Sequence, residues 1–164
     1  MSSPEYTKMN PFKLISNFIF HNNDKWLTIQ ALFFSAQMRA LLRFVPIARL
    51  HPYLGEQGEE SPSEPLCHAD LRTASHISIR VNRVANRTPW ESKCFVRALV
   101  AQKLLRKYGL SSTLYLGVGK DENQQMVAHA WIRSGPHCIT GEDERDYAVV
   151  ARFAKYPKHH PAAK

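Results

Sequence analysis

The fold is decided by residues 88–109, TPWESKCFVRALVAQKLLRKYG. The opening letters combine a capping threonine, a proline suited to the first helical position and the glutamate of a capping box. We therefore expect a helix that begins at Thr88 or, with an irregular first turn, near Ser92, and that ends at Gly109. Either start places Cys94 in the first turns of this helix.

After this helix the sequence changes to a strand pattern. β-Branched and aromatic residues alternate over 112–118, and further strands are predicted over 127–132, 137–140 and 147–153. A Ser-Gly-Pro turn at 134–136 sets the second and third of these strands antiparallel. A helix followed by short antiparallel strands predicts the α+β class.

The first half of the chain is predicted to be helical. Apolar residues recur at three- and four-residue spacing before Pro46, which ends an amphipathic helix: Leu27, Ala31, Phe34, Met38, Leu41 and Leu42. This apolar stripe packs against the rest of the chain or, alternatively, docks a partner protein. A further helix is expected over 71–84.

The chain divides at residues 55–65, GEQGEESPSEP. This polar, acidic stretch rich in Gly, Pro and Ser is typical of a linker or a long exposed loop. It separates an N-terminal helical region, residues 1–54, from a second domain over residues 66–155. A basic tail, residues 156–164, is expected to be disordered.

Length and charge bound the class of protein. A chain of 164 residues suits one compact domain, or a small domain with a helical extension. The net charge of +8 favours acidic partners of any kind and selects none of them. No stretch interleaves basic and aromatic residues as a stacking nucleic-acid platform requires, so no nucleic-acid partner is expected.

The compartment is predicted from the cysteines and the apolar segments. Three cysteines are an odd and sparse set, which favours a reducing cytoplasm over a disulfide framework. The N-terminus lacks the pattern of a signal peptide. Polar residues interrupt the apolar run over 26–48, so we expect no membrane-spanning helix: Gln30, Gln37, Arg39 and Arg43.

Cys94 is the candidate nucleophile. A helix N-terminus carries partial positive charge and unpaired amide groups, which lower the pKa of a thiol and can hydrogen-bond an oxyanion. This effect on Cys94 is weak if the helix begins at Thr88 and strong if it begins near Ser92. The alternative is that Cys94 is a small buried core residue, as cysteines outside disulfides often are.

His129 is the candidate base. Strand alternation over 127–132, VAHAWI, places His129, Trp131 and Arg133 on one face. A neutral imidazole can take the proton of a neighbouring thiol near neutral pH. The alternative is a structural histidine that is hydrogen-bonded at the margin of a sheet.

A carboxylate is the expected third member, because it would orient the imidazole through its other nitrogen. Glu142 and Asp143 follow the strand over 137–140, which the hairpin sets beside the strand of His129. The alternative for both is an ordinary solvated acidic turn.

No metal site or cofactor is expected. Cys94, His129, His137 and Cys138 can be assembled into a zinc site on paper. Their spacing, however, lacks the usual C-x-x-C and H-x₃₋₅-H pairs that mark such sites.

Four short motifs follow one another in the second half of the chain: Trp90-x-x-x-Cys94-x-x-Arg97-Ala98, Leu104-Leu105-x-x-x-Gly109, Leu116-Gly117-Val118 and Ala128-His129-Ala130-Trp131. In this order they resemble the lasso peptide biosynthesis B2 proteins, which are transglutaminase-like leader peptidases. The resemblance is close over residues 90–153, and the helical first half is also similar to the N-terminal region of that family.

The resemblance implies a transglutaminase-like, papain-like cysteine peptidase core over residues 66–155. It implies that Cys94 is the nucleophile and His129 its base, and that no cofactor is used. The third member, normally an aspartate after the next strand, corresponds here to Glu142 or Asp143.

The resemblance also implies a biosynthetic role. Such peptidases remove the leader from a ribosomally made lasso precursor peptide, which is held by a separate leader-recognition (B1) protein. An ATP-dependent cyclase then closes the macrolactam. The implied partners are therefore the B1 protein, the precursor peptide and the cyclase.

Two alternatives stay open. One is a transglutaminase-like amide exchange in place of hydrolysis. The other is a non-catalytic scaffold that gathers the proteins of a biosynthetic complex through the N-terminal amphipathic helix and the basic surface.

Overall fold

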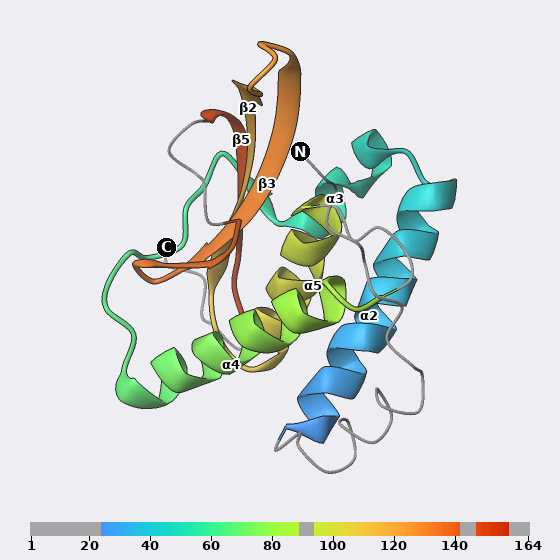
Figure 1. The fold of residues 1–164 in the computed structure, drawn as a ribbon. Helices are drawn as coiled ribbons and strands as arrows, with labels where there is room; N and C mark the ends of the chain where they lie inside the picture. The colour runs from blue at the N-terminus through green and yellow to red at the C-terminus, as the bar shows by residue number, and fades with distance from the viewer. Residues whose placement is uncertain (1–23, 89–93, 142–146, 158–164) are drawn as a thin grey trace.

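The computed structural model describes residues 24–88, 94–141 and 147–157. Helices cover one side of a five-stranded sheet: the helix labelled α5 lies between the sheet and α2, and α4 packs against both α5 and β4 (Figure 1). The predicted α+β class is confirmed.

The helices are, in chain order, α2 (Lys25–Phe44), η1 (Ile47–Leu50), α3 (His51–Leu54), α4 (His68–Ala85) and α5 (Cys94–Lys107). Helix α2 ends before Pro46, as the sequence predicts. Helix α5 is followed by Gly109, whose φ of +83° only glycine adopts readily. Most of the capping box predicted ahead of Cys94 falls in residues 89–93, which lie outside the described residues.

The strands are β1 (Glu56–Gln57), β2 (Ser112–Lys120), β3 (Met126–Ser134), β4 (His137–Thr140) and β5 (Ala148–Lys155). Their order in the sheet is β1-β5-β2-β3-β4, and neighbours pair antiparallel throughout. The four strands predicted from the sequence are confirmed, and the two-residue β1 is an addition to them.

The core lies between α5 and one face of the sheet. Helix α5 is apolar on most sides because one side packs against the sheet and α2 and α4 cover the other sides. Leu104 of α5 and the sheet residues Leu114, Ile132 and Phe153 are all fully buried in this core. Helix α2 adds Ala31 to the same cluster, so the N-terminal helix shares the core of the sheet.

The segment that leads from α3 to α4 lies against the sheet. Its β1 pairs with β5, and Ser61 is only 2 % exposed. The amide of Ser61 donates to Thr113 Oγ1 at 2.8 Å, and Arg133 Nη2 donates to the Ser61 carbonyl at 2.9 Å. These bonds fix the segment over the face of the sheet opposite α5.

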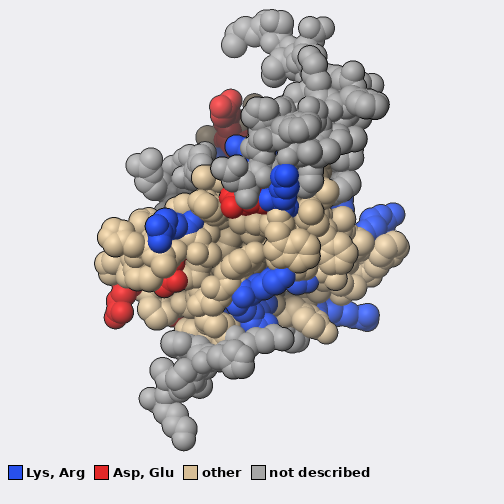
Figure 2. Space-filling model, turned by 90° about the horizontal axis from the view of Figure 1, so that it is seen from below, with Lys and Arg blue, Asp and Glu red and all other residues tan. Residues whose placement is uncertain are grey.

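Basic side chains are distributed over several separate places on the surface. Figure 2 shows Lys and Arg in scattered groups across one face, with fewer Asp and Glu among them. Within the described part of the chain, none of the helices combines the length and apolar character that crossing a bilayer demands.

Candidate active site

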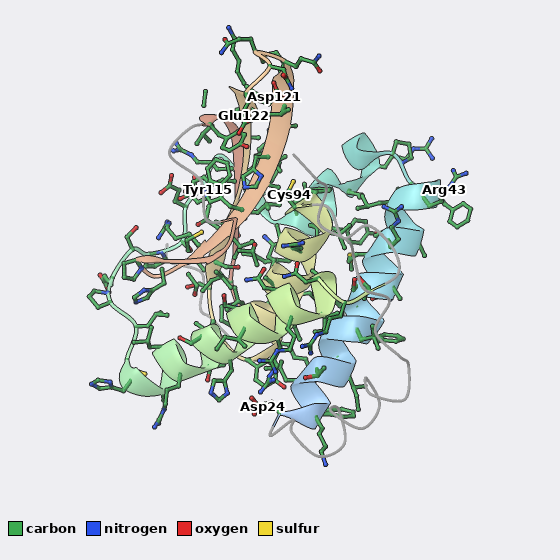
Figure 3. The ribbon with its side chains drawn as sticks, in the orientation of Figure 1. Asp24, Arg43, Cys94, Tyr115, Asp121 and Glu122 are labelled. Carbon is green, nitrogen blue, oxygen red and sulfur yellow. The ribbon has the colours of Figure 1, made fainter. Side chains whose placement is uncertain are left out.

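Cys94 is the first described residue of helix α5, because residues 89–93 lie outside the described part of the chain. Its side chain is half-buried and packs against the hydrophobic core. Figure 3 shows Cys94 at the first turn of α5, on the side of the helix that faces β3.

His129 lies in β3, opposite Gly117 of β2. Its ring stacks on Tyr147 with a centroid separation of 4.6 Å and on Trp131 at 6.0 Å. Trp131 in turn stacks on Tyr115 at 5.4 Å. The predicted face shared by His129 and Trp131 is confirmed, and two tyrosines join it to form an aromatic face.

Two glycines let these rings approach the backbone. A Cβ on Gly117 would lie 2.8 Å from the Trp131 ring and 3.0 Å from Tyr147 Cβ. A Cβ on Gly141 would lie 2.5 Å from Trp131 Cβ and 3.0 Å from His129 Nε2. The chain that leaves β4 therefore runs directly past the imidazole.

Gly141 immediately precedes the two acidic candidates. Glu142 and Asp143 lie outside the described residues, as does Trp90 of the first motif. The described backbone reaches Gly141 next to His129 Nε2, and the two acidic candidates follow directly in the sequence.

Helix α5 packs against β3 through its core-facing side. Cys94 belongs to that side, together with Ala130 and Ile132 of β3. His129 belongs to the other, aromatic face of the strand. Among the described residues, β4 pairs with β3 only from Ile132 to Ser134, so the margin of β3 at His129 is not paired by β4.

The other two cysteines are more exposed than Cys94. Cys67 is the N-cap of α4, where Sγ accepts from the amide of Asp70 at 3.5 Å. Cys138 lies on β4, and its thiol donates to Gly141 O at 3.4 Å. Because Gly141 abuts His129, the structure brings the Cys138 thiol into the neighbourhood of the imidazole, which the sequence spacing did not indicate.

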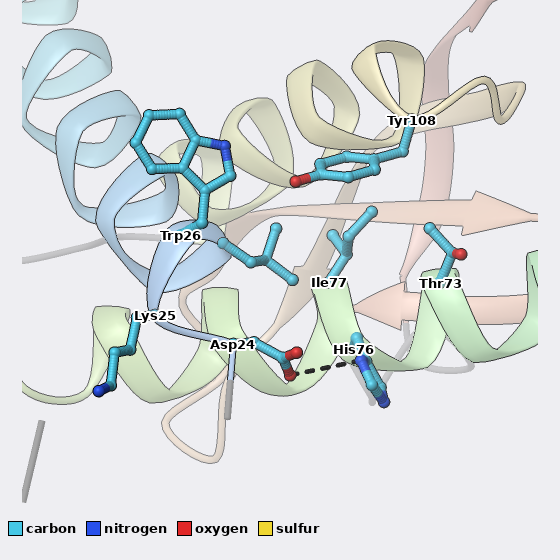
Figure 4. Close-up of a pocket in the computed structure, with 8 residues that line it drawn as sticks. Asp24, Lys25, Trp26, Thr73, His76, Ile77 and Tyr108 are labelled. Carbon is cyan, nitrogen blue, oxygen red and sulfur yellow. Dashed lines mark ion pairs between the residues drawn. The ribbon is translucent and has the colours of Figure 1, made fainter. Parts of the chain in front are cut away.

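Figure 4 shows a second pair of ionisable side chains, His76 and Asp24, which lies away from Cys94 and His129. A hollow of about 650 Å³ lies between α2 and α4, and Trp26 and Tyr108 are among the residues that line it. There His76 Nδ1 lies 3.3 Å from Asp24 Oδ2, which Arg80 also contacts at 3.0 Å. Cys94 and His129 do not line this hollow.

Groups of three or more His, Cys, Asp or Glu side chains that would suit a metal ion are absent from the described residues.

Comparison with protein families gives one match. The family model described as "Transglutaminase-like superfamily" matches residues 38–152, which run from the middle of α2 into β5 and include both Cys94 and His129. The comparisons with curated proteins and with solved structures give no match.

Proposed function

Because the chain belongs to the transglutaminase-like superfamily, we propose that it is a cysteine peptidase with Cys94 as nucleophile and His129 as base. The observation that carries the proposal is the position of Cys94 in the first described turn of α5, the helix that packs on the strand of His129. Under this proposal the thiol and the imidazole come together at the margin of β3 that β4 leaves unpaired.

The proposed reaction is acyl transfer in two steps. His129 takes the proton of the Cys94 thiol, and the thiolate attacks the carbonyl carbon of the scissile peptide bond. The amide of Cys94 stabilises the oxyanion. The C–N bond then breaks, the imidazolium gives its proton to the leaving amine, and a thioester remains.

Hydrolysis completes the cycle. The imidazole takes a proton from water, the hydroxide adds to the thioester carbonyl, and the C–S bond breaks. The leader leaves with a new carboxylate and Cys94 regains its proton. Glu142, or Asp143, orients the imidazole in this proposal, and no cofactor takes part.

We propose as substrate the precursor peptide of a lasso peptide, presented by a separate leader-recognition (B1) protein in the cytoplasm. The support is the ordered set of motifs around Cys94 and His129, whose spacing resembles that of the leader peptidases. Cleavage would free the N-terminal amine of the core peptide for the macrolactam cyclase, which is a further partner under this proposal.

The test follows cleavage of a precursor peptide by mass spectrometry, in the presence of its B1 protein. We expect Cys94→Ala and His129→Ala each to lower kcat/KM by on the order of 10³-fold or more. Cys67→Ser and Cys138→Ser are the matched controls, and we expect both to keep activity near that of the unsubstituted protein.

Two outcomes contradict the assignment. If Cys94→Ala still cleaves the precursor, Cys94 is not the nucleophile. If Cys138→Ser abolishes cleavage while Cys94→Ala does not, the nucleophile is the thiol on β4.

Amide exchange shares the same thioester and differs only in the acceptor. Added hydroxylamine would divert the thioester to a leader hydroxamate under either activity. Without it, hydrolysis gives the free leader acid, and exchange gives a leader joined to an amine of a second peptide.

A scaffold role is favoured by one observation. Helix α2 exposes Trp26, Ile29 and Phe33 on a common side, with Trp26 67 % exposed. A scaffold predicts that Cys94 and His129 are dispensable for product formation, whereas Leu41→Asp abolishes complex formation.

A further inference from the structure

A hollow of about 230 Å³ lies between α2, α3 and α5, at the end of α5 away from Cys94. Its walls combine two kinds of side chain. Leu41, Leu54 and Leu99 are among its apolar residues, and Lys103, Arg106 and Lys155 are its cations. We call this site the basic groove.

The three cations of the basic groove lie close together without a balancing acid. In the described residues, none of them forms an ion pair with a carboxylate. Burial first, and then the charges of Arg106 and Lys103, lower the pKa of Lys155 to about 8. The cations therefore repel one another, and a bound anion would relieve that repulsion.

The hydrogen bonds of these groups leave capacity for a ligand. Lys155 Nζ donates to the Tyr53 carbonyl, and Lys103 Nζ donates to Gln37 Oε1 at 2.6 Å. Arg106 Nε is buried and makes no hydrogen bond to any described residue. A buried donor without an acceptor costs free energy that a carboxylate would recover.

The basic groove continues along the surface of α2. A second hollow, of about 490 Å³, shares Met38, Leu41, Tyr53 and Lys103 with the first. Phe44, whose side chain is 82 % exposed, lies on the wall of the second hollow. Two joined apolar hollows beside clustered cations suit an extended chain better than a single small molecule.

We propose that the basic groove binds an acidic, apolar segment of another polypeptide, with a carboxylate at Arg106 and Lys155 and an adjacent apolar side chain in the inner hollow. The site goes beyond the proposed peptidase activity and does not depend on it. Arg106 is twelve residues after Cys94. At the helical rise this separates Arg106, the carboxylate-binding end of the groove, from the candidate nucleophile by about 18 Å along the helix axis.

The test measures fluorescence polarisation of a fluorescein-labelled peptide in which Leu and Glu alternate, added to the full chain. We expect saturable binding that weakens at high salt, as charge contacts require. For a peptide with Gln in place of each Glu, we expect the affinity to fall by at least on the order of tenfold.

Two variants locate the site. Arg106→Gln and Lys155→Met should each weaken binding of the Glu peptide by on the order of tenfold. Lys120→Met is the matched control, because Lys120 is an exposed lysine at the other end of the same sheet, and it should leave the affinity unchanged. Circular dichroism melts establish that each variant is folded.

Several results would overturn the proposal. Equal affinity for the Gln and Glu peptides would show that the groove does not recognise a carboxylate. This comparison uses only the unsubstituted protein, so it does not depend on the folding of any variant. If Lys120→Met weakens peptide binding as much as the two groove variants do, the peptide is attracted only by the net charge of the protein. If hexanoate binds and the peptide does not, the groove takes small organic acids instead of a polypeptide.

Discussion

Gly141 is the residue on which the position of the imidazole depends most directly. Its φ is +88°, and a Cβ there would meet both Trp131 Cβ and His129 Nε2. We expect Gly141→Ala to lower the free energy of unfolding by about 2–4 kcal/mol, since backbone strain and a steric clash add. Displacement of the ring should lower kcat/KM by on the order of 10²-fold. Urea unfolding and steady-state cleavage measure the two effects.

Gly109 provides the matched control for that substitution. Its φ of +83° is similar, but a Cβ there would meet no atom within 4 Å. Gly109→Ala should therefore cost only about 1 kcal/mol of backbone strain and leave kcat/KM unchanged. If the two alanine variants show the same free energy of unfolding and the same kcat/KM, the close approach of Gly141 to His129 does not contribute to stability or activity.

Lys155 should make stability depend on alkaline pH. Its pKa is about 8 in the folded chain against 10.5 for an unperturbed lysine, so between these values the unfolded chain binds more protons. The free energy of unfolding should therefore rise with pH across this window, by on the order of 1 kcal/mol or less after solvent screening. Below pH 8 both states are protonated and the penalty of the buried charge is complete.

Lys155→Met tests this assignment by urea unfolding at a series of pH values. The variant lacks the titrating amine, so its free energy of unfolding should lose that rise between pH 8 and 10.5. An unchanged rise in the variant would assign the titration to another group, with Lys103 the first to test, since burial and the charge of Lys107 lower its pKa as well.

The sequence identified some residues of the candidate site and missed others for a physical reason. Alternation within one strand was enough to place His129 and Trp131 on a common face. The contact with Tyr147 depends on which strands are neighbours and in which register, and a pattern within one strand specifies neither. The approach of Gly141 follows from the hairpin between β3 and β4, which the sequence predicted. The proposed roles of Cys94 and His129 in catalysis remain predictions for the variants above.

Among the elements, the segment between α3 and α4 is held by a buried hydroxyl pair. Thr113 Oγ1 accepts from the amide of Ser61 and lies 2.8 Å from its hydroxyl oxygen. Thr113→Val keeps the shape of the side chain but leaves the Ser61 amide without its acceptor, so we expect a loss of about 1–3 kcal/mol in the free energy of unfolding. Chemical denaturation measures it.

A double-mutant cycle separates this pair from general effects on β2. Ser61→Ala combined with Thr113→Val should give a coupling energy of at least about 0.5 kcal/mol. Thr73→Val is the matched control, because the Thr73 hydroxyl makes only an exposed hydrogen bond to the Ala69 carbonyl within α4, and it should change stability by less than about 0.5 kcal/mol. Strict additivity of the two single losses would show that the segment is held by something else.

Elements with a strong local pattern were predicted well. The helix expected over 71–84 is α4, His68–Ala85, which starts earlier because Cys67 serves as its N-cap. The strand expected over 137–140 has the same bounds in the structure. The pairing of Glu56–Gln57 with β5 was not foreseen, since a two-residue strand in a polar, glycine-rich stretch carries no period of its own.

The order of the strands is a property of the whole molecule. β5 lies between β1 and β2, so the last strand of the chain joins the segment before α4 to the strand after α5. This arrangement rests on contacts between residues far apart in the sequence, such as Ala154 with Glu56. No local pattern reports such contacts, which is why the sequence predicted the strands and the hairpin between β3 and β4 but not the position of β5 between β1 and β2.

The N-terminal helix and the sheet should unfold in one step, because Leu27 of α2 and Ile132 of β3 belong to the same buried cluster. A Trp26→Phe, Trp90→Phe variant retains Trp131, which is 3 % exposed in the sheet, as its one fluorescent indole. We expect its fluorescence and its helical circular dichroism at 222 nm to change along a single urea curve. The unsubstituted protein should give the same circular dichroism curve. A helical signal lost at lower urea than the indole signal would mean that the helical region before Gly55 is a separate cooperative unit, and that its packing against the sheet contributes little to the stability of the candidate site.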